Sequence, residues 1–291
     1  MCMEFQLSQA KRDKAKIKLG LQGPSGAGKT YSALLLAKGL CGDWSKIAVI
    51  DSEHHSANLY SHLGNYNVLP LSPPYSPERY ATAIQVCENA GMQVIIIDSI
   101  SHEWESSGGI LDIHSNMLGN SFTNWSRLTP RHNDFINKIL QSNCHIIATM
   151  RAKQDYVLSE KNGKQVPEKV GLKGITREGT DYELTVVLEL DIKHQAKSSK
   201  DRTGLFDKMP EFTITKKTGE RILKWCSQST SMEEVKAKVE AASDLQELTL
   251  IYNTYTEYQT ALLPDFQDKK AKLKNNLVTT IHDNGSTTNN P

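Results

Sequence analysis

The chain has 291 residues, of which 38% are hydrophobic and 23% charged, with a formal net charge of +1. This length accommodates one α/β domain and a small appendage. The near-zero charge excludes a global basic field, so any contact with nucleic acid has to be local. The longest apolar stretch, residues 94–97, is far shorter than the roughly 20 residues of a membrane span, and the first ten residues do not resemble a signal peptide. We therefore expect a cytoplasmic protein without a membrane partner.

A strand predicted over residues 17–21 leads into a segment that matches the phosphate-loop pattern G-x-x-x-x-G-K-[ST]. A helix predicted over residues 31–38 follows and is expected to end at Gly39. Glycines in such a loop let backbone N–H groups surround phosphate oxygens at the positive end of a helix. In this pattern Lys29 reaches the β- and γ-phosphates, and the Thr30 hydroxyl ligates Mg²⁺. The predicted nucleotide-binding residues are Gly23, Pro24, Ser25, Gly26, Ala27, Gly28, Lys29, Thr30 and Tyr31.

Strands and helices alternate along the next part of the chain. Further strands are predicted over residues 46–51, 94–98, 145–149 and 184–192. Helices are predicted from Pro77 to about Ala90, with Ser76 as N-cap, and from Thr129 to about Gln141. This alternation predicts an α/β fold with a mainly parallel central sheet flanked by helices.

The composition changes to Ser, Thr and Gln near residues 227–231, which indicates a linker. Helical periodicity follows over residues 233–242, 245–258 and 266–277, and the polar end is expected to be disordered. The predicted organisation is a nucleotide-binding domain over 1–226, an α-helical segment over 232–278 and a disordered tail over 279–291.

Hydrolysis of a nucleotide requires an acid that holds Mg²⁺ and a carboxylate that activates water. Asp98, at the end of the buried apolar strand, is the candidate for the metal, together with Thr30. Three glutamates are candidates for the base. Glu103 and Glu105 lie just beyond that strand, whereas Glu53 follows the preceding strand at the edge where ligands of parallel sheets gather. This position favours Glu53 as the base.

With the phosphate loop, Val49-Ile-Asp-Ser-Glu-His-His55 and Val94-Ile-Ile-Ile-Asp-Ser-Ile100 resemble the ATPase core of the RecA recombinases. The absence of an N-terminal oligomerisation domain, together with residues 148–153 and 199–204, narrows the resemblance to RecA-like phage single-strand annealing ATPases. It covers residues 17–225 and implies that ATP is the nucleotide, that Glu53 is catalytic and that Asp98 binds the metal. The family has a Gln or Asn sensor of the γ-phosphate where this chain has Thr149-Met150-Arg151, so Thr149 or Arg151 is the candidate substitute.

The polar stretch 151–181 occupies the place of that family's DNA-binding loop, although a mobile surface loop has the same composition. The resemblance implies contact with single-stranded DNA, with an aromatic ring for base stacking. The candidate DNA-binding residues are Arg151, Lys153, Tyr156, Lys161, Lys164, Lys173 and Arg177.

Lys200 and Arg202 resemble the Lys-x-Arg fingers that RecA-like ring helicases project into a neighbour's ATP, and a basic turn is the alternative. The resemblance therefore implies an Mg²⁺-dependent, DNA-stimulated ATPase that anneals single strands as a homo-oligomeric ring or filament. A host single-strand binding protein is a further candidate partner. Two alternatives stay open: a helicase or helicase loader, and a nucleotide-gated adaptor that recruits replication or repair proteins.

Overall fold

The computed structural model describes residues 15–161, 164–227, 232–255 and 258–283, with only the backbone described for 154–161, 164–171 and 275–283. The chain divides into two compact units. One consists of Lys14–Cys226, and the other contains the residues from Ser227 onwards. The expected disorder of residues 284–291 falls outside the described part.

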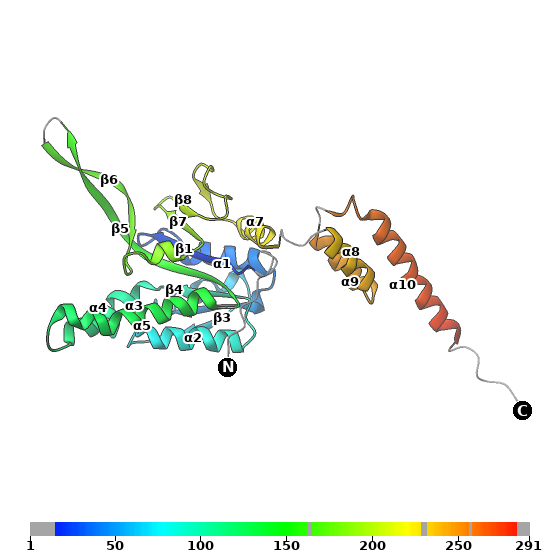
Figure 1. Ribbon diagram of the computed structural model, residues 1–291, viewed down its shortest axis with the longest axis horizontal. Helices are drawn as coiled ribbons and strands as arrows, with labels where there is room; N and C mark the ends of the chain where they lie inside the picture. Colours follow the sequence, from blue (N-terminus) through cyan, green and yellow to red (C-terminus); the bar gives the residue numbers. More distant parts are fainter. Residues whose placement is uncertain (1–14, 162–163, 228–231, 256–257, 284–291) are drawn as a thin grey trace, which may run out of the picture. The chain divides into compact units, whose positions relative to one another are not determined.

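A central sheet organises the larger unit (Figure 1). Its strands run in the order β3-β2-β4-β5-β1-β7-β8-β9, and those from β3 to β7 are parallel. β8 and β9 continue the sheet with antiparallel pairing, and β6 pairs with β5 alone. The strands are β1 (Lys18–Gly23), β2 (Ile47–Asp51), β3 (Asn67–Pro70), β4 (Val94–Asp98), β5 (His145–Lys161), β6 (Lys164–Gly174), β7 (Val186–Leu190), β8 (Gln195–Asp201) and β9 (Phe212–Thr213). The predicted mainly parallel sheet is confirmed.

Helices cover both faces of this sheet, because successive strand residues point to opposite sides. Val94 and Ile96 pack in one cluster with α1 and α7, whereas Ile95 and Ile97 pack in the other with α2 and α5. The helices of this unit are α1 (Lys29–Cys41), α2 (Pro77–Asn89), α3 (Ser101–Glu105), α4 (Ile110–Asn116), α5 (Ser121–Gln141), α6 (Thr180–Glu183) and α7 (Lys216–Ser227), with 3-10 helices at Trp44–Lys46 and Ser56–Leu63.

Gly39 is not the end of the first helix, as the sequence suggested. α1 continues to Cys41, and Gly42, with a φ of 71°, forms its C-cap. Gly39 is buried against α7 instead: a Cβ atom there would lie 2.2 Å from the Lys216 carbonyl oxygen and 2.7 Å from the Gly219 Cα. The glycine therefore permits close approach of two helices.

The helix expected from Thr129 begins eight residues earlier. The Asn120 side chain accepts hydrogen bonds from the N–H groups of Phe122, at 2.9 Å, and Thr123, at 3.4 Å, and so caps α5 at Ser121. Pro130 therefore lies inside the helix, although proline is most typical of a first turn.

The polar stretch after residue 151 is not a loop throughout. β5 continues beyond the parallel sheet and pairs with β6 from Ala152 opposite Gly174 to Lys161 opposite Lys164. These two strand segments project together from the sheet (Figure 1). We call residues 152–174 the β5–β6 arm.

The second unit contains α8 (Met232–Ala241), α9 (Leu245–Thr254) and α10 (Leu263–Asp283). A small core joins these helices, with Val235, Val239, Leu248 and Phe266 among its buried residues. The backbone of α10 continues to Asp283, five residues into the stretch expected to be disordered, and the disorder of that stretch stays a prediction. None of the helices in the described part of the chain combines the length and apolar character that a bilayer span requires.

The close contact between α1 and α7 predicts that Gly39→Ala destabilises the protein, although a glycine-to-alanine change inside a helix usually stabilises it. Inside a helix, alanine is more favourable than glycine by about 1 kcal/mol, so helix propensity alone would make Gly39→Ala more stable than the wild type. The added methyl overlaps the Lys216 carbonyl, and we expect a loss of about 1–3 kcal/mol in the free energy of unfolding. Urea unfolding measures this difference, and a variant more stable than the wild type would contradict the packing described.

Candidate functional site

The phosphate loop joins β1 to the N-terminus of α1. Gly26 and Gly28 both have a φ of 80°, the left-handed region that glycine adopts without strain. A Cβ on Gly23 would lie 2.6 Å from the Leu190 carbonyl oxygen, so this glycine permits close packing against β7. The loop therefore presents backbone N–H groups at a helix N-terminus, which favours anionic oxygens.

The Lys29 ammonium donates hydrogen bonds to the carbonyls of Gly23 and Pro24, both at 2.9 Å, and thus lies over the loop. Burial lowers the pKa of Lys29, although the charges of Asp98 and Glu53 oppose that shift. Lys29 is thus placed to supply a positive charge to a phosphate bound in the loop.

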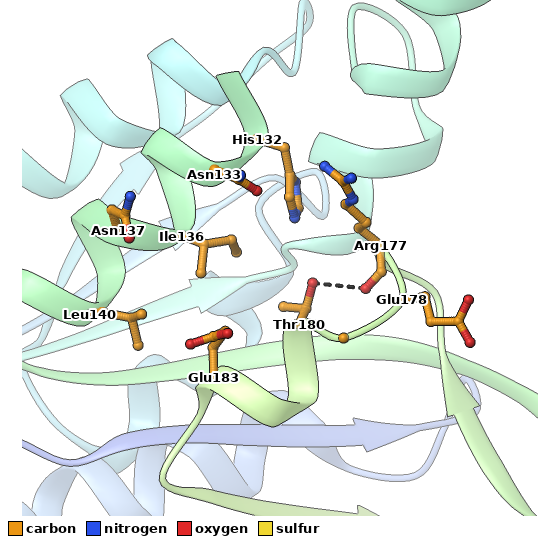
Figure 2. Close-up of a pocket in the computed structure, with 10 residues that line it drawn as sticks. His132, Asn133, Ile136, Asn137, Leu140, Arg177, Glu178, Thr180 and Glu183 are labelled. Carbon is orange, nitrogen blue, oxygen red and sulfur yellow. Dashed lines mark hydrogen bonds between the residues drawn. The ribbon is translucent and has the colours of Figure 1, made fainter. Parts of the chain in front are cut away.

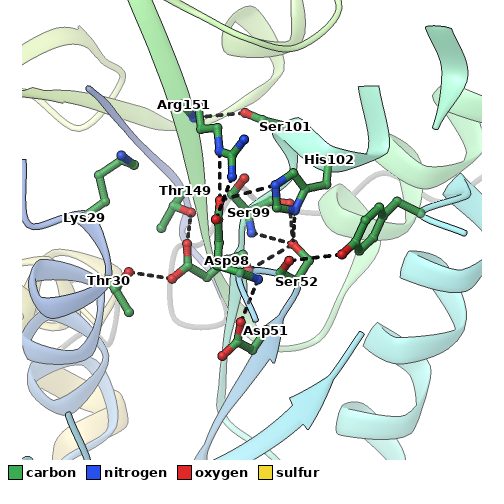
Figure 3. Close-up of polar contacts among 12 residues, drawn as sticks. Lys29, Thr30, Asp51, Ser52, Asp98, Ser99, Ser101, His102, Thr149 and Arg151 are labelled. Atoms are coloured by element: carbon green, nitrogen blue, oxygen red, sulfur yellow. Dashed lines mark hydrogen bonds and ion pairs between the residues drawn. The ribbon is translucent and has the colours of Figure 1, made fainter. Parts of the chain in front are cut away.

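Asp98 lies at the end of β4 and is 2% exposed. One carboxylate oxygen accepts a 2.6 Å hydrogen bond from the Thr30 hydroxyl, and the other accepts one of 2.6 Å from Thr149 (Figure 3). Burial raises the pKa of Asp98, while the two hydroxyls lower it. The sequence prediction had paired Thr30 with Asp98 but had not assigned Thr149 to support this carboxylate.

Thr30 and Asp98 fit a magnesium ion chemically. Mg²⁺ prefers oxygen ligands and is commonly held by one or two carboxylates together with substrate phosphates. A hydroxyl and a buried carboxylate meet here beside a phosphate loop, and a cation would offset the unfavourable burial of the Asp98 charge. These two residues would hold the ion.

Glu53 is positioned by Asp51, the last residue of β2. The Asp51 carboxylate accepts hydrogen bonds from the backbone N–H groups of Glu53, at 2.8 Å, and Ala57, at 2.9 Å. These bonds fix the turn that follows the strand. Asp51 is therefore a structural residue of the site, a role that the sequence analysis missed.

The Glu53 carboxylate lies between Arg151 and His102. Arg151 donates from Nε to Oε1 at 3.0 Å and from Nη2 to Oε2 at 2.7 Å. His102 Nε2 lies 3.5 Å from Oε1, and its Nδ1 lies 2.9 Å from the Ser52 hydroxyl. Burial raises the pKa of Glu53, but the hydrogen bonds from Arg151 and the positive charges around it prevail and hold that pKa below its ordinary value.

A pocket of about 870 Å³ brings these groups together. Two tyrosines on its wall, Tyr31 and Tyr60, have ring centroids 5.8 Å apart. His194, in the turn between β7 and β8, also lines the pocket beside Gly28. The sequence analysis missed Tyr60 and His194, since nothing in their local pattern links them to the loop. The remaining lining residues are Ser25, Gly26, Lys29, Thr30, Ser32, Glu53, Ser56, Asp98, Arg151, Ala152, Thr213 and Ile214.

Of the three candidate bases, Glu53 alone lines this pocket. Glu103 is fully buried, with both carboxylate oxygens 3.1 Å from His132 Nδ1. Burial raises the pKa of Glu103, and its contact with His132 opposes the shift. Glu105, at the end of α3, is not among the pocket residues. The geometry thus favours Glu53.

Lys200 and Arg202 lie near the N-terminal ends of the parallel strands, whereas the phosphate loop lies at their C-terminal ends. Lys200 is paired with Val187 near the start of β7, and the Arg202 N–H donates to the Thr185 carbonyl. The Lys200 ammonium donates to the carbonyls of Asp181, at 2.9 Å, and Tyr182, and Arg202 Nη2 donates to that of Tyr182 at 2.8 Å. Neither reaches the pocket of its own chain, and their action on a neighbouring subunit stays a prediction.

The candidate DNA-binding residues separate into three places. Arg151 lines the nucleotide pocket, where Glu53 engages its guanidinium, and its contact with DNA stays a prediction. Arg177 lines a different pocket, of about 380 Å³, beside His132 and Thr180 (Figure 2). The others lie on the β5–β6 arm, where the side chains of Lys153 and Lys173 are exposed and those of Tyr156, Lys161 and Lys164 fall outside the described residues.

Comparison with known proteins assigns the family. A family model described as an AAA domain matches residues 15–241. A search of curated proteins found no match. The family match spans more than half of the chain and includes the phosphate loop, Glu53 and Asp98. The chain therefore belongs to the AAA domain family and carries a nucleotide-binding P-loop ATPase domain.

Proposed function

We propose that this ATPase domain works on single-stranded DNA, with Mg²⁺ at Thr30 and Asp98, in strand annealing of the phage recombination type. The observation that supports this proposal most directly is that the β5–β6 arm begins at the nucleotide pocket. β5 passes from the nucleotide pocket, at Arg151, directly into the arm. A single strand, β5, would thus connect a ligand of the arm to the hydrolytic site.

Within the pocket, each group has a chemical task. Lys29 neutralises charge on the phosphates, and Glu53 accepts the proton of the attacking water. The metal supplies Lewis-acid polarisation of phosphate oxygens when bound. Tyr31 and Tyr60 offer apolar ring surface to a nucleobase.

The charge of the arm supports an anionic ligand. The arm carries five lysines against three acidic residues, an excess of two in 23 residues, whereas the entire chain has a net charge of only +1. The register places Lys153 opposite Lys173 and Lys161 opposite Lys164. Like charges directly opposite each other destabilise a strand pair. Glu178 lies 3.6 Å from the Lys173 ammonium, and phosphates along the arm would offset the repulsion that remains.

Assembly is a separate part of the proposal. We propose that the protein acts as a homo-oligomer in which Lys200 and Arg202 of one subunit serve the ATP of the next, with a host single-strand binding protein as an additional partner. Their internal hydrogen bonds to α6 would have to be exchanged for phosphate contacts. DNA-stimulated hydrolysis would distinguish this function from a nucleotide-gated adaptor, and lack of strand unwinding would distinguish it from a helicase.

The catalytic assignment is tested by two substitutions with different outcomes. Lys29→Ala should abolish ATP binding or hydrolysis, because the loop lysine supplies the charge on the phosphates. Glu53→Gln should still bind ATP but hydrolyse it more slowly by a factor on the order of 10² or more, as expected for the loss of a general base. Steady-state hydrolysis and equilibrium binding of a fluorescent ATP analogue measure the two effects.

Glu105→Gln is the matched control, since it removes a nearby carboxylate that does not line the pocket. It should keep the wild-type rate. Loss of hydrolysis in Glu105→Gln with wild-type turnover in Glu53→Gln would show that the base has been misassigned.

The DNA assignment is tested by salt dependence. Each phosphate contact to a single strand contributes about 0.7 to the slope of log affinity against log salt. Replacing both Lys153 and Lys173 by Gln should therefore reduce that slope by about 1.4 for an oligothymidine ligand. The control replaces Lys217 and Lys224, two exposed lysines of α7, by Gln and should keep the wild-type slope. An unchanged slope in the arm variant would place the DNA path elsewhere.

A further inference from the structure

A buried histidine, His102, stands directly behind the proposed base. It is the second residue of α3, is only 4% exposed and is not among the residues that line the nucleotide pocket. Its Nε2 lies 3.5 Å from Glu53 Oε1. The Tyr75 ring packs against the imidazole with the ring centroids 5.0 Å apart, and the Tyr75 hydroxyl donates to the Ser52 carbonyl at 3.3 Å. The imidazole is thereby held with one edge toward Glu53.

The Ser52 hydroxyl indicates which nitrogen of this ring carries the hydrogen (Figure 3). It has one hydrogen and three acceptors within reach, which are His102 Nδ1 at 2.9 Å, the Asp98 carbonyl at 3.1 Å and the Ser99 carbonyl at 3.2 Å. Both carbonyls have another donor, since Asp98 accepts from the Ser52 N–H at 2.7 Å and Ser99 from the Tyr80 hydroxyl at 2.9 Å. We therefore assign the hydroxyl hydrogen to Nδ1. The neutral ring then carries its own hydrogen on Nε2, the nitrogen that faces the base.

The charge state of His102 suits a donor to a base. Burial lowers the pKa of His102, although the charge of Glu53 opposes the shift, so the ring is uncharged at neutral pH. A full positive charge beside a carboxylate favours its deprotonated form and so weakens it as a base. A neutral N–H donor orients the carboxylate with a smaller effect of this kind. His102 can thus hold Glu53 in place and leave it able to take up a proton.

We propose that His102 is a positioning residue for Glu53, whose carboxylate its Nε2–H holds toward the attacking water during ATP hydrolysis. This inference rests on the proposed function, because it takes Glu53 as the base. The distance of 3.5 Å is longer than an ordinary hydrogen bond. Catalytic hydrogen bonds are often long without substrate and shorten in the complex, and we expect this one to shorten when ATP binds.

Two substitutions of His102 separate the two edges of its ring. A glutamine amide reaches the position of Nε2, whereas an asparagine amide reaches only that of Nδ1. His102→Gln therefore keeps a donor to Glu53, and His102→Asn keeps only the partner of Ser52. His102→Asn should lower kcat for ATP about tenfold, or about 1.4 kcal/mol, with little change in KM, and His102→Gln should stay within about twofold of the wild type.

The same substitution in the Glu53→Gln background shows whether His102 acts through Glu53. A residue that acts only through the base has nothing to position once that base is removed, so His102→Asn should change the residual rate by less than about twofold there. His132→Gln is the matched control, because it removes another buried contact between a histidine and a glutamate, with Glu103, outside the nucleotide pocket. It should keep the wild-type kcat. Rates are compared at a temperature at which every variant is folded, as checked by thermal unfolding.

Three results would contradict the inference. A kcat of His102→Asn equal to or above that of His102→Gln would mean that the Nε2 edge has no role in hydrolysis. A loss of the same size in the Glu53→Gln background would mean that His102 acts on another group, and an equal loss in His132→Gln would make the effect one of general packing. Hydrolysis by Glu53→Gln at the wild-type rate would instead refute the proposed base, and the inference with it.

Discussion

The site depends on the two hydrogen bonds that the buried carboxylate of Asp98 accepts. Its two oxygens accept hydrogen bonds from Thr30 of α1 and Thr149 of β5, so one side chain at the end of β4 joins three elements. A buried carboxylate without partners would be strongly unfavourable, and each hydroxyl satisfies one oxygen. These two bonds hold together the start of α1, the end of β4 and the part of β5 that leads into the arm.

The second polar connection at this sheet edge is more adjustable. Arg151 and Glu53 are both partly exposed, and each could find other partners in water or on a phosphate. A well-buried carboxylate with two short hydroxyl contacts therefore holds the site together, while the ion pair beside it is partly exposed.

The parts of this protein that the sequence predicted are those with local chemical signatures. The glycines and Lys29 of the loop follow a fixed spacing, and the apolar run of β4 ends at Asp98, as expected of a strand buried on both faces.

The features that the sequence did not predict depend on contacts between distant residues. The partnership of Arg151 with Glu53 joins residues 98 apart in the chain, which no local pattern reveals. The arm was missed because its strands lack a continuous apolar face and so read as a polar loop. Gly39 was misread because a glycine that ends a helix and one that admits a neighbouring helix look alike in sequence.

The proposed function requires Asp98 and a magnesium ion to act together on the bound nucleotide. The most direct test measures the thermal unfolding of the wild type and of Asp98→Asn with ATP, in the presence of either Mg²⁺ or a chelator. At about 100 times Kd, bound nucleotide adds about 2.7 kcal/mol to the free energy of unfolding, or about 5–10 °C in Tm. We expect Mg²⁺ to increase the ATP-dependent shift in the wild type and to have no such effect in Asp98→Asn. An equal Mg²⁺-dependent gain in both proteins would contradict the assignment.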